Sequence, residues 1–333
     1  MKIAFYDTKP YDKVWFAPLA EKAGAEIKFL QSRLSEETAF LARGADAVCC
    51  FVNDEVRDQV IDTLVGQGVR GVLLRCSGYD KVDLRAAAGK IRVFRVPAYS
   101  PTAVAEYAAA LMLAVNRKVH KAYFRTREFN FSINGLMGVG LHGKKAGVIG
   151  LGRIGAVMVN ILKGFGMDVM VYDPYAKKSR GIKCVSLDEL LRESDVITLH
   201  CPLNSETRYV INKNSISRMK DGVILINTSR GALVDTTALL DALACKKFGG
   251  VALDVYEEEE DYFFEDKSGD IINDDELIKL MAYPNVLISS HQAFFTEEAM
   301  RAIAETTLEN MKALMEDRET ENEIKTAETV AAT

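Results

Sequence analysis

Short apolar runs alternate with amphipathic segments along most of the chain. In the first hundred residues, the apolar runs are residues 2–7, 26–30, 47–52, 71–76 and 92–96. Segments with helical periodicity lie between them, around residues 14–22, 36–42, 56–65 and 84–88. Runs of this length in regular alternation are typical of β-α-β units. The pattern predicts a parallel sheet with helices on both faces.

A second series of the same kind occupies residues 145–291. Its apolar runs are residues 146–150, 168–172, 195–200, 222–227, 250–254 and 286–289. They predict a doubly wound parallel sheet, in which ligands bind beyond the carboxyl ends of the strands. The first series lacks a glycine fingerprint, so the second series is the better candidate for a nucleotide-binding domain.

The two series are joined by Ser100-Pro101, a typical helix start with serine as N-cap and proline at the first helical position. The segment that follows, to about Arg127, is apolar on all sides, which indicates burial against several neighbours. We interpret it as the connection between two domains, with an outer face that contacts a second copy of the chain. Burial of the whole helix within one chain is the alternative.

The last amphipathic segment, from Thr296 to about residue 316, is predicted to pack back on the first domain. One domain would then consist of residues 1–99 and 296–333, and the other of residues 100–295. The tail from residue 317 is polar and is expected to be poorly ordered.

Residues 146–155 read A-G-V-I-G-L-G-R-I-G and place Gly150, Gly152 and Gly155 in G-x-G-x-x-G spacing. Between a strand and a helix, such glycines allow a tight turn, close approach of a pyrophosphate and close helix–strand packing. The helix N-terminus then offers unpaired N–H groups to the phosphates. Asp173, 18 residues beyond the last glycine, follows the next strand and is placed to bind a ribose diol. An ordinary turn, or the nucleotide site of a methyltransferase, shares this pattern.

The acid at position 173 favours NAD over NADP as cofactor, because a carboxylate repels a 2′-phosphate. Lys177 and Lys178 lie close enough in sequence to weaken that preference.

Composition is that of an ordinary globular enzyme, with 333 residues, 48% hydrophobic and 27% charged. A net charge of −5 and a pI near 5.6 argue against nucleic acid or an anionic membrane as partner. No apolar stretch reaches the length of a membrane span, and the N-terminus lacks a signal-peptide core. The six cysteines have no C-x-x-C spacing, so neither a metal site nor disulfides are expected. These features predict a cytoplasmic protein.

Three apolar runs of the second series are followed by polar groups that suit acid–base chemistry. Arg230 follows the run at 222–227, Asp254 ends the next run and the acids 257–260 follow it, and His291 follows the last. Arginine binds a planar carboxylate through two parallel hydrogen bonds, and histidine exchanges a proton with a carbonyl or alcohol. A neighbouring glutamate would stabilise the imidazolium. Each residue alone is more often structural, so the hypothesis depends on their occurring together behind a dinucleotide fingerprint.

The motifs G-L-G-R-I-G, N-T-S-R-G-A-L-V-D, D-V-Y-E-x-E and H-Q-A-F together resemble the D-isomer-specific 2-hydroxyacid dehydrogenase family. The resemblance extends over nearly the whole chain and includes R-C-S-G-Y-D-K-V-D-L, V-P-A-Y-S-P-T-A-V-A-E and F-F-E-D-K-S-G-D-I-I. Within the family, the chain is most similar to bacterial fermentative NAD-dependent D-lactate dehydrogenases. The resemblance implies an α/β fold with two doubly wound domains. These are a Rossmann-type NAD domain and a flavodoxin-like substrate domain, with the active site in the cleft between them.

The resemblance also implies roles for individual residues. Arg230 would bind the substrate carboxylate, His291 would be the acid–base residue, and Glu259 its carboxylate partner, although adjacent acids leave the register open. The residues implied in substrate binding beside Arg230 are Ser77, Gly78, Tyr99 and Phe294. Those implied in cofactor binding are Gly150, Gly152, Arg153, Ile154, Gly155, Asp173, Cys201, Pro202, Thr207, Thr228, Ser229 and Asp254. The cofactor-binding role is implied least strongly for Thr207, because the loop before it varies in the family.

By the same resemblance, the expected reaction is reversible reduction of pyruvate to D-lactate with NADH. The alternatives are a larger 2-keto acid such as 2-ketoisocaproate or phenylpyruvate, or hydroxypyruvate or glyoxylate. A protein of a different class, an NAD-sensing co-repressor, retains the same Arg–Glu–His set. The expected partners are a small 2-keto or 2-hydroxy acid and further copies of the chain.

Overall fold

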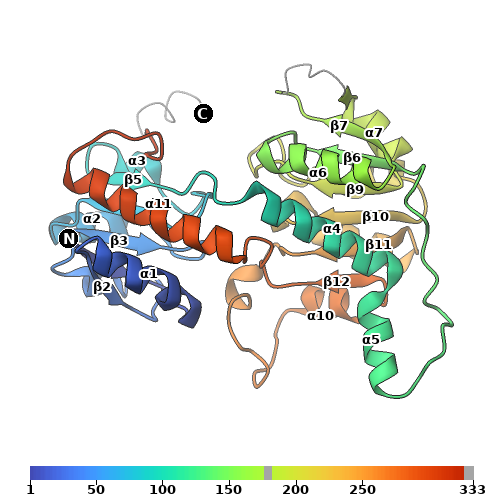
Figure 1. Ribbon diagram of the computed structural model, residues 1–333, viewed down its shortest axis with the longest axis horizontal. Helices are drawn as coiled ribbons and strands as arrows, with labels where there is room; N and C mark the ends of the chain where they lie inside the picture. Colours follow the sequence, from blue (N-terminus) through green and yellow to red (C-terminus); the bar gives the residue numbers. More distant parts are fainter. Residues whose placement is uncertain (176–181, 326–333) are drawn as a thin grey trace. The chain divides into compact units, whose positions relative to one another are not determined.

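The computed structural model describes residues 1–175 and 182–325 of the chain (Figure 1). The chain divides into two compact units. Unit 1 is Met1–Ser100 together with the C-terminal segment from Thr296, and unit 2 is Pro101–Phe295. The chain thus leaves the first unit after Ser100 and returns to it at Thr296.

Unit 1 is built on a five-stranded parallel sheet with strand order β2-β1-β3-β4-β5. The strands are β1 (Lys2–Phe5), β2 (Glu26–Phe29), β3 (Ala47–Cys50), β4 (Gly71–Leu74) and β5 (Arg92–Phe94). Every residue of β3 and β4 is buried, as expected for central parallel strands covered on both faces. The strand order is that of flavodoxin-like sheets, so the predicted fold class is confirmed for this part.

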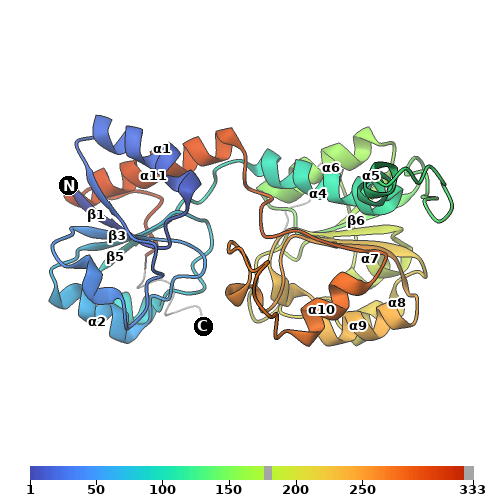
Figure 2. The same cartoon turned by 90° about the horizontal axis from the view of Figure 1, so that it is seen from below.

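The helices of unit 1 cover both faces of this sheet. They are α1 (Pro10–Lys22), α2 (Asp58–Gly66), α3 (Leu84–Ala87) and α11 (Glu297–Met315), with the 3-10 turn η1 (Ala39–Ala42). Figure 2 shows α1 and α11 over one face of the sheet and α2 over the other. α11 contacts α1 and β4, and a β-carbon built at Gly71 would lie 2.5 Å from Leu314 Cδ2. Because Gly71 has no side chain, Leu314 of α11 can pack directly against β4.

The start of the C-terminal tail lies along β5. The backbone N–H of Arg95 donates to the carbonyl of Asn322 (3.0 Å), and that of Ile324 donates to Val93 (2.8 Å). Arg92 adds an ion pair with Glu323. The prediction of a poorly ordered tail is therefore wrong for residues 317–325, because pairing with the sheet edge holds them. Residues 326–333 lie outside the described part of the chain.

Unit 2 contains a seven-stranded parallel sheet with strand order β12-β11-β10-β9-β6-β7-β8. The strands are β6 (Lys145–Ile149), β7 (Asp168–Tyr172), β8 (Lys183–Cys184), β9 (Val196–Leu199), β10 (Val223–Asn227), β11 (Phe248–Leu253) and β12 (Val286–Ile288). Six of them match the predicted runs. The two-residue edge strand β8 was not predicted, because it is too short to show a periodic pattern. The predicted doubly wound fold is confirmed here too.

Two apolar clusters cover the two faces of this sheet. The helices of unit 2 are α4 (Pro101–Arg117), α5 (Val119–Arg127), α6 (Arg153–Gly164), α7 (Leu187–Glu193), α8 (Lys213–Arg218), α9 (Thr236–Ala244) and α10 (Asp275–Ala282), with the 3-10 turns η2 (Gly231–Leu233) and η3 (Glu259–Asp261). In Figure 2, α4 and α6 lie over one face, and α8, α9 and α10 over the other. Among the described residues, no helix is both long and apolar enough to cross a membrane.

The apolar helix after Pro101 is shorter than predicted. Lys118, with a positive φ of 53°, interrupts it and separates α4 from α5. Most apolar residues of α4 are buried against α6, β10 and β11 within unit 2. Burial within one chain, the alternative, is thus what the structure shows for these residues.

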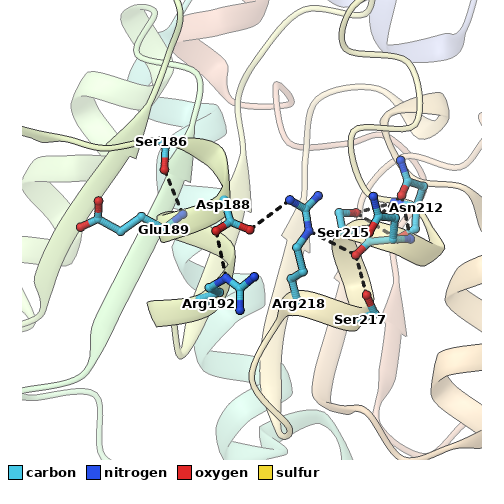
Figure 3. A network of polar contacts seen from close by, with 9 residues as sticks. Ser186, Asp188, Glu189, Arg192, Asn212, Ser215, Ser217 and Arg218 are labelled. Atoms are coloured by element: carbon cyan, nitrogen blue, oxygen red, sulfur yellow. Dashed lines mark hydrogen bonds and ion pairs between the residues drawn. The ribbon is translucent and has the colours of Figure 1, made fainter.

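A polar network joins α7 and α8 on the surface of unit 2 (Figure 3). Asp188 pairs with Arg192 in its own helix (2.9 Å) and with Arg218 of α8 (3.1 Å). Hydrogen bonds from both guanidinium groups lower the pKa of the Asp188 carboxyl. The side chain of Ser186 caps α7 by accepting a hydrogen bond from the backbone of Glu189. The network holds two helices together and includes none of the predicted site residues.

Candidate active site

Six strands of unit 2 end at the same level. The pairing register aligns their last or nearly last residues in one row across the sheet. In spatial order, these are Tyr172, Ile149, Leu199, Asn227, Leu253 and Ile288. The residues that follow them in sequence therefore gather along one edge. They include Asp173, Gly150, Cys201, Thr228, Asp254 and, three residues beyond Ile288, His291.

The glycine turn between β6 and α6 needs its glycines for three different reasons. Gly150 has φ 97°, and a β-carbon there would lie 2.5 Å from the backbone nitrogen of Cys201. At Gly155, a β-carbon would lie 2.0 Å from the carbonyl oxygen of Gly150. Gly152 precedes the first residue of α6, and no described atom lies within 4 Å of a β-carbon built there. This open space at a helix N-terminus, beside Arg153 and Ile154, suits a diphosphate.

The carboxylate of Asp173 is held beside the glycine turn. Its oxygens accept hydrogen bonds from the backbone N–H groups of Leu151 (2.7 Å) and Tyr175 (2.8 Å). The Tyr175 hydroxyl donates in turn to Glu206 (2.8 Å). Asp173 is thus oriented beside the space at Gly152. Lys177 and Lys178 lie outside the described residues.

Replacing Asp173 with asparagine tests the ribose assignment. Asparagine keeps an acceptor for Leu151 but removes the charge that repels a 2′-phosphate. The ratio of kcat/KM with NADH to that with NADPH is expected to fall about tenfold. Asp168→Asn, at the opposite end of β7, serves as control and is expected to keep the wild-type ratio. An unchanged ratio in Asp173→Asn would assign the ribose contact elsewhere.

The loops after β9 and β10 are tied to one another. The Ser229 hydroxyl donates to the carbonyl of Cys201 (2.7 Å), and the Thr207 hydroxyl donates to that of Pro202 (2.6 Å). Burial raises the pKa of the Cys201 thiol to about 11, so it is uncharged. Thr228 is buried, and its hydroxyl oxygen has no hydrogen-bond partner among the described residues. A ligand with polar groups at this edge would satisfy that hydroxyl.

His291 and Glu259 form a hydrogen-bonded pair. Their Nδ1 and Oε1 atoms are 2.7 Å apart, and each side chain is 14% exposed. The other oxygen of Glu259 accepts from the backbone N–H of Tyr256 (3.0 Å). Glu257 lies elsewhere, because its carboxylate pairs with Arg208 (3.2 Å) and with the Tyr209 hydroxyl. Glu259 is therefore the acid that is hydrogen-bonded to His291.

The turn that presents His291 is organised by Asp254. The Asp254 carboxylate accepts hydrogen bonds from Ser289 Oγ (2.6 Å) and from the backbone N–H groups of Gln292 (3.0 Å) and Ala293 (2.8 Å). Its backbone carbonyl accepts from the His291 N–H (2.7 Å). Burial raises the pKa of this carboxyl, and the three hydrogen bonds oppose that rise. Asp254 thus shapes the turn in which His291 adopts a φ of 54°.

A second histidine, His200, also follows one of the six strands. Burial lowers its pKa to about 4, so it is neutral near pH 7. Its Nε2 lies 2.9 Å from the hydroxyl of Thr198, in the strand that precedes it. His291, which has a carboxylate partner, is the better acid–base candidate.

Arg230 is positioned by two residues that the sequence analysis missed. The Asn227 side chain donates to the carbonyl of Arg230 (2.8 Å) and accepts from the N–H of Ser229 (3.0 Å). A β-carbon at Gly231 would lie 2.1 Å from the carbonyl oxygen of Tyr256. The backbone at Gly231 therefore lies in close contact with the backbone at Tyr256, three residues before Glu259. The motif N-T-S-R-G contains both residues, so its first and last letters were the available signal.

Ser77, Gly78 and Tyr99 belong to unit 1, whereas the other predicted site residues belong to unit 2. Ser77 and Gly78 follow β4, where the Ser77 carbonyl accepts from Arg95 (3.3 Å) and the Gly78 carbonyl from the Cys76 thiol (3.3 Å). Phe294 is buried near the end of unit 2, with its ring centroid 6.0 Å from that of Phe295.

The loop after β4 is anchored by a buried arginine that the sequence analysis also missed. The Arg75 guanidinium lies 4.5 Å from the ring centroids of both Phe5 and Phe51. It donates to the carbonyls of Tyr6 (3.1 Å) and Asp7 (2.8 Å). Nothing in the local pattern marked Arg75, because its partners are distant in sequence.

The described residues contain no group of three or more side chains that could hold a metal ion. The polar groups of the site instead suit an organic cofactor. An open helix N-terminus, a fixed carboxylate and a buried unpaired hydroxyl lie along one sheet edge, where Rossmann-type domains bind a dinucleotide.

Comparison with known proteins agrees with this geometry. Residues 109–293 match the family model described as "D-isomer specific 2-hydroxyacid dehydrogenase, NAD binding domain". D-Lactate dehydrogenase of Escherichia coli strain K12 is 48% identical over 328 residues, which cover 97% of this chain and 100% of that protein. A solved structure of the pyruvate reductase of Chlamydomonas reinhardtii has a TM-score of 0.89 and 44% identity, covering 97% and 98% of the two chains.

A structure of D-2-hydroxyisocaproate dehydrogenase has a TM-score of 0.85 and 32% identity, covering 98% of this chain and 100% of its own. The matched domain identifies NAD as the cofactor, and the residues at the strand ends fit it. The glycine turn, the carboxylate after β7 and the Glu259–His291 pair occur on a chain that is similar to these enzymes over nearly its full length. The chain therefore belongs to the D-isomer specific 2-hydroxyacid dehydrogenase family.

Proposed function

We propose that the chain is an NAD-dependent D-lactate dehydrogenase that reversibly reduces pyruvate. The observation that carries the proposal is the Glu259–His291 pair, which lies on the same sheet edge as Arg230 and the glycine turn. The high identity to D-lactate dehydrogenase of Escherichia coli supports this substrate. When bound, NADH supplies the hydride.

In this proposal, Arg230 binds the substrate carboxylate through two parallel charged hydrogen bonds. His291 uses Nδ1 to contact Glu259, which leaves Nε2 to donate a proton to the substrate carbonyl oxygen. Glu259 stabilises the imidazolium that donates it. In the reverse direction, neutral His291 accepts the proton of the alcohol. The expected contributions of Ser77, Gly78, Tyr99 and Phe294 to substrate binding remain part of the proposal.

Replacing Glu259 with glutamine tests the proton-donor arrangement. The imidazolium loses its charged partner, and Nδ1 keeps only a neutral acceptor, so kcat for pyruvate reduction is expected to fall by about tenfold or more. Glu257→Gln makes the same chemical change on a residue bound to Tyr209 and is expected to keep the wild-type kcat. Equal kcat for wild type and Glu259→Gln would contradict the pairing.

The preferred substrate is tested with a panel of 2-keto acids. Loss of NADH absorbance gives kcat/KM for pyruvate, 2-ketoisocaproate, phenylpyruvate, hydroxypyruvate and glyoxylate. Pyruvate is expected to exceed the larger acids by about tenfold or more, the discrimination that one or two pocket methylene groups provide. A higher kcat/KM for 2-ketoisocaproate would replace D-lactate dehydrogenase with a dehydrogenase for larger acids.

The same assay separates an enzyme from a binding protein. A co-repressor-like NAD sensor would quench or enhance NADH fluorescence on binding without consuming NADH in the presence of any acid of the panel. Steady turnover at micromolar protein supports the dehydrogenase.

We also propose that the protein is a homo-oligomer, with contacts made by α5 and the segment after it rather than by α4. We call α5 and the segment after it, residues 119–139, the arm. Its large apolar side chains are 53–86% exposed. They are Val119, Tyr123, Phe124, Phe129, Phe131, Ile133, Met137 and Val139. A patch of this kind on a protein surface is typical of a protein interface, and a second copy is the partner that is always present.

Sedimentation velocity tests this arrangement. The wild-type protein is expected to sediment as a species larger than the 36.8 kDa chain, and Phe131→Asp with Ile133→Asp to shift it to the monomer. Ile271→Asp, at an equally exposed apolar residue outside the arm, is the control and is expected to leave the assembly intact. A monomeric wild type would contradict the proposed oligomer.

A cytoplasmic location and a fermentative role are proposed together with the enzyme activity. Cell fractionation tests the location.

A further inference from the structure

The motif F-F-E-D-K-S-G-D-I-I lies in the segment between β11 and α10, and the proposed mechanism gives it no role. Side-chain contacts fix this segment at its ends and in its middle. The Tyr256 hydroxyl donates to Asp274 (2.8 Å), which joins the start of the segment to its end. Phe263 is buried in the apolar cluster of unit 2. The segment is therefore anchored at its two ends and at Phe263, whereas most residues from 265 to 271 are exposed.

Within it, the ring of Phe264 contacts the imidazole of His291. The two ring centroids are 5.7 Å apart, and the ring planes are inclined by 35°. This distance lies within the range of about 4.5–7 Å over which aromatic rings interact. Phe264 thus lies beside the imidazole whose Nδ1 is hydrogen-bonded to Glu259.

Both residues of this pair have left-handed backbone conformations. Phe264 has φ 68° and His291 has φ 54°. Such values are rare for residues that carry a β-carbon, and bulky residues with them persist only where the surroundings hold them. Because both residues have strained backbones and neighbouring rings, we infer that the surrounding fold holds the two rings together.

The Glu259 hydrogen bond alone does not determine the tilt of the imidazole. It fixes the direction of Nδ1, but the ring can still rock about that contact. A neighbouring aromatic ring packed beside the imidazole restricts this freedom. The direction of Nε2, on the opposite side of the ring, then follows from both contacts.

We propose that Phe264 is a positioning residue that sets the tilt of the His291 ring, so that Nε2 is directed at the substrate carbonyl. This inference rests on the proposed role of His291 as proton donor. A purely structural role is the alternative, because Phe264 is partly buried against the same apolar cluster.

Phe264→Leu removes the flat ring but keeps an apolar side chain. The kcat for pyruvate reduction is expected to fall by up to about tenfold, the rate equivalent of one aromatic pair. The Kd for NADH and the Tm are expected to stay at wild-type values. Phe264→Tyr restores the ring and is expected to restore kcat. Ile271→Ala, in the same segment but 86% exposed, is the matched control and is expected to behave as wild type.

NMR detects the ring contact without turnover. The chain has four histidines, so the His291 ring protons are assigned by their loss in His291→Gln. A ring current from Phe264 is expected to displace these resonances in the wild type and in Phe264→Tyr, and the displacement is expected to vanish in Phe264→Leu.

Wild-type kcat in Phe264→Leu would overturn the inference, as would unmoved His291 resonances. A loss of kcat accompanied by a lowered Tm, and not restored by tyrosine, would also overturn it in favour of the structural role. Failure of the proposed function looks different, because His291→Gln would then retain turnover.

Discussion

Replacing His291 with alanine is expected to lower kcat for pyruvate reduction by about 10²–10⁴-fold, the usual contribution of a general acid. The alkoxide that forms as hydride arrives would lack a proton donor. The Kd for NADH, measured by fluorescence, is expected to remain near that of the wild type, because the glycine turn and Asp173 are untouched. His142→Ala, at an exposed histidine of the same unit, is the control and is expected to keep full activity.

The double variant His291→Ala, Glu259→Gln sharpens this test. Glu259 acts through the imidazole, to which it is hydrogen-bonded at 2.7 Å. Once the imidazole is gone, removing the glutamate charge is expected to cost no further activity, since residues that act as a unit are not additive. An additional loss in the double variant would give Glu259 a role of its own. Normal turnover in His291→Ala alone would remove the proposed mechanism.

The second large effect is expected at Arg230. Lysine keeps the charge but lacks the planar fork, so it cannot form two parallel hydrogen bonds with a carboxylate. We expect Arg230→Lys to raise the KM for pyruvate, with some loss of kcat, and to lower kcat/KM by about 100-fold in total. Arg208→Lys, at a residue paired with Glu257, is the control and is expected to change neither parameter appreciably.

Methyl pyruvate separates carboxylate binding from a general disturbance of the site. The ester has no carboxylate, so the wild-type enzyme is expected to use it poorly relative to pyruvate. Arg230→Lys is expected to narrow that gap, because it loses activity mainly toward the acid. Equal losses toward acid and ester would mean that Arg230 supports the site in another way.

Local patterns were sufficient to predict most of the sheet framework of unit 2 and to nominate candidate site residues. Buried parallel strands are nearly continuous apolar runs, so six of the seven strands of unit 2 could be recognised individually. Polar residues that directly follow such runs lie at one edge of the sheet. By this rule, Arg230, Asp254 and His291 are candidates on the sequence alone.

Local patterns did not predict features that depend on the rest of the fold. The break at Lys118 carries no glycine or proline signal, so the helix after Pro101 was predicted too long. The pairing of residues 322–324 with β5 depends on an edge that a polar tail does not reveal. The same holds for Arg75, whose two aromatic neighbours come from different strand ends.

The sequence by itself determined the β-α-β order, the glycine turn, the acid after β7 and the identity of the three groups proposed for chemistry. These follow from periodicity and from the position of a residue relative to a strand, which are local properties. Only the tertiary structure decided which of several adjacent glutamates meets His291, because Tyr209 and Arg208 bind Glu257 and leave Glu259 to the imidazole. It likewise decided that Phe264 lies against that ring and that α4 is buried within unit 2, since such contacts depend on side chains packing across segments far apart in the chain.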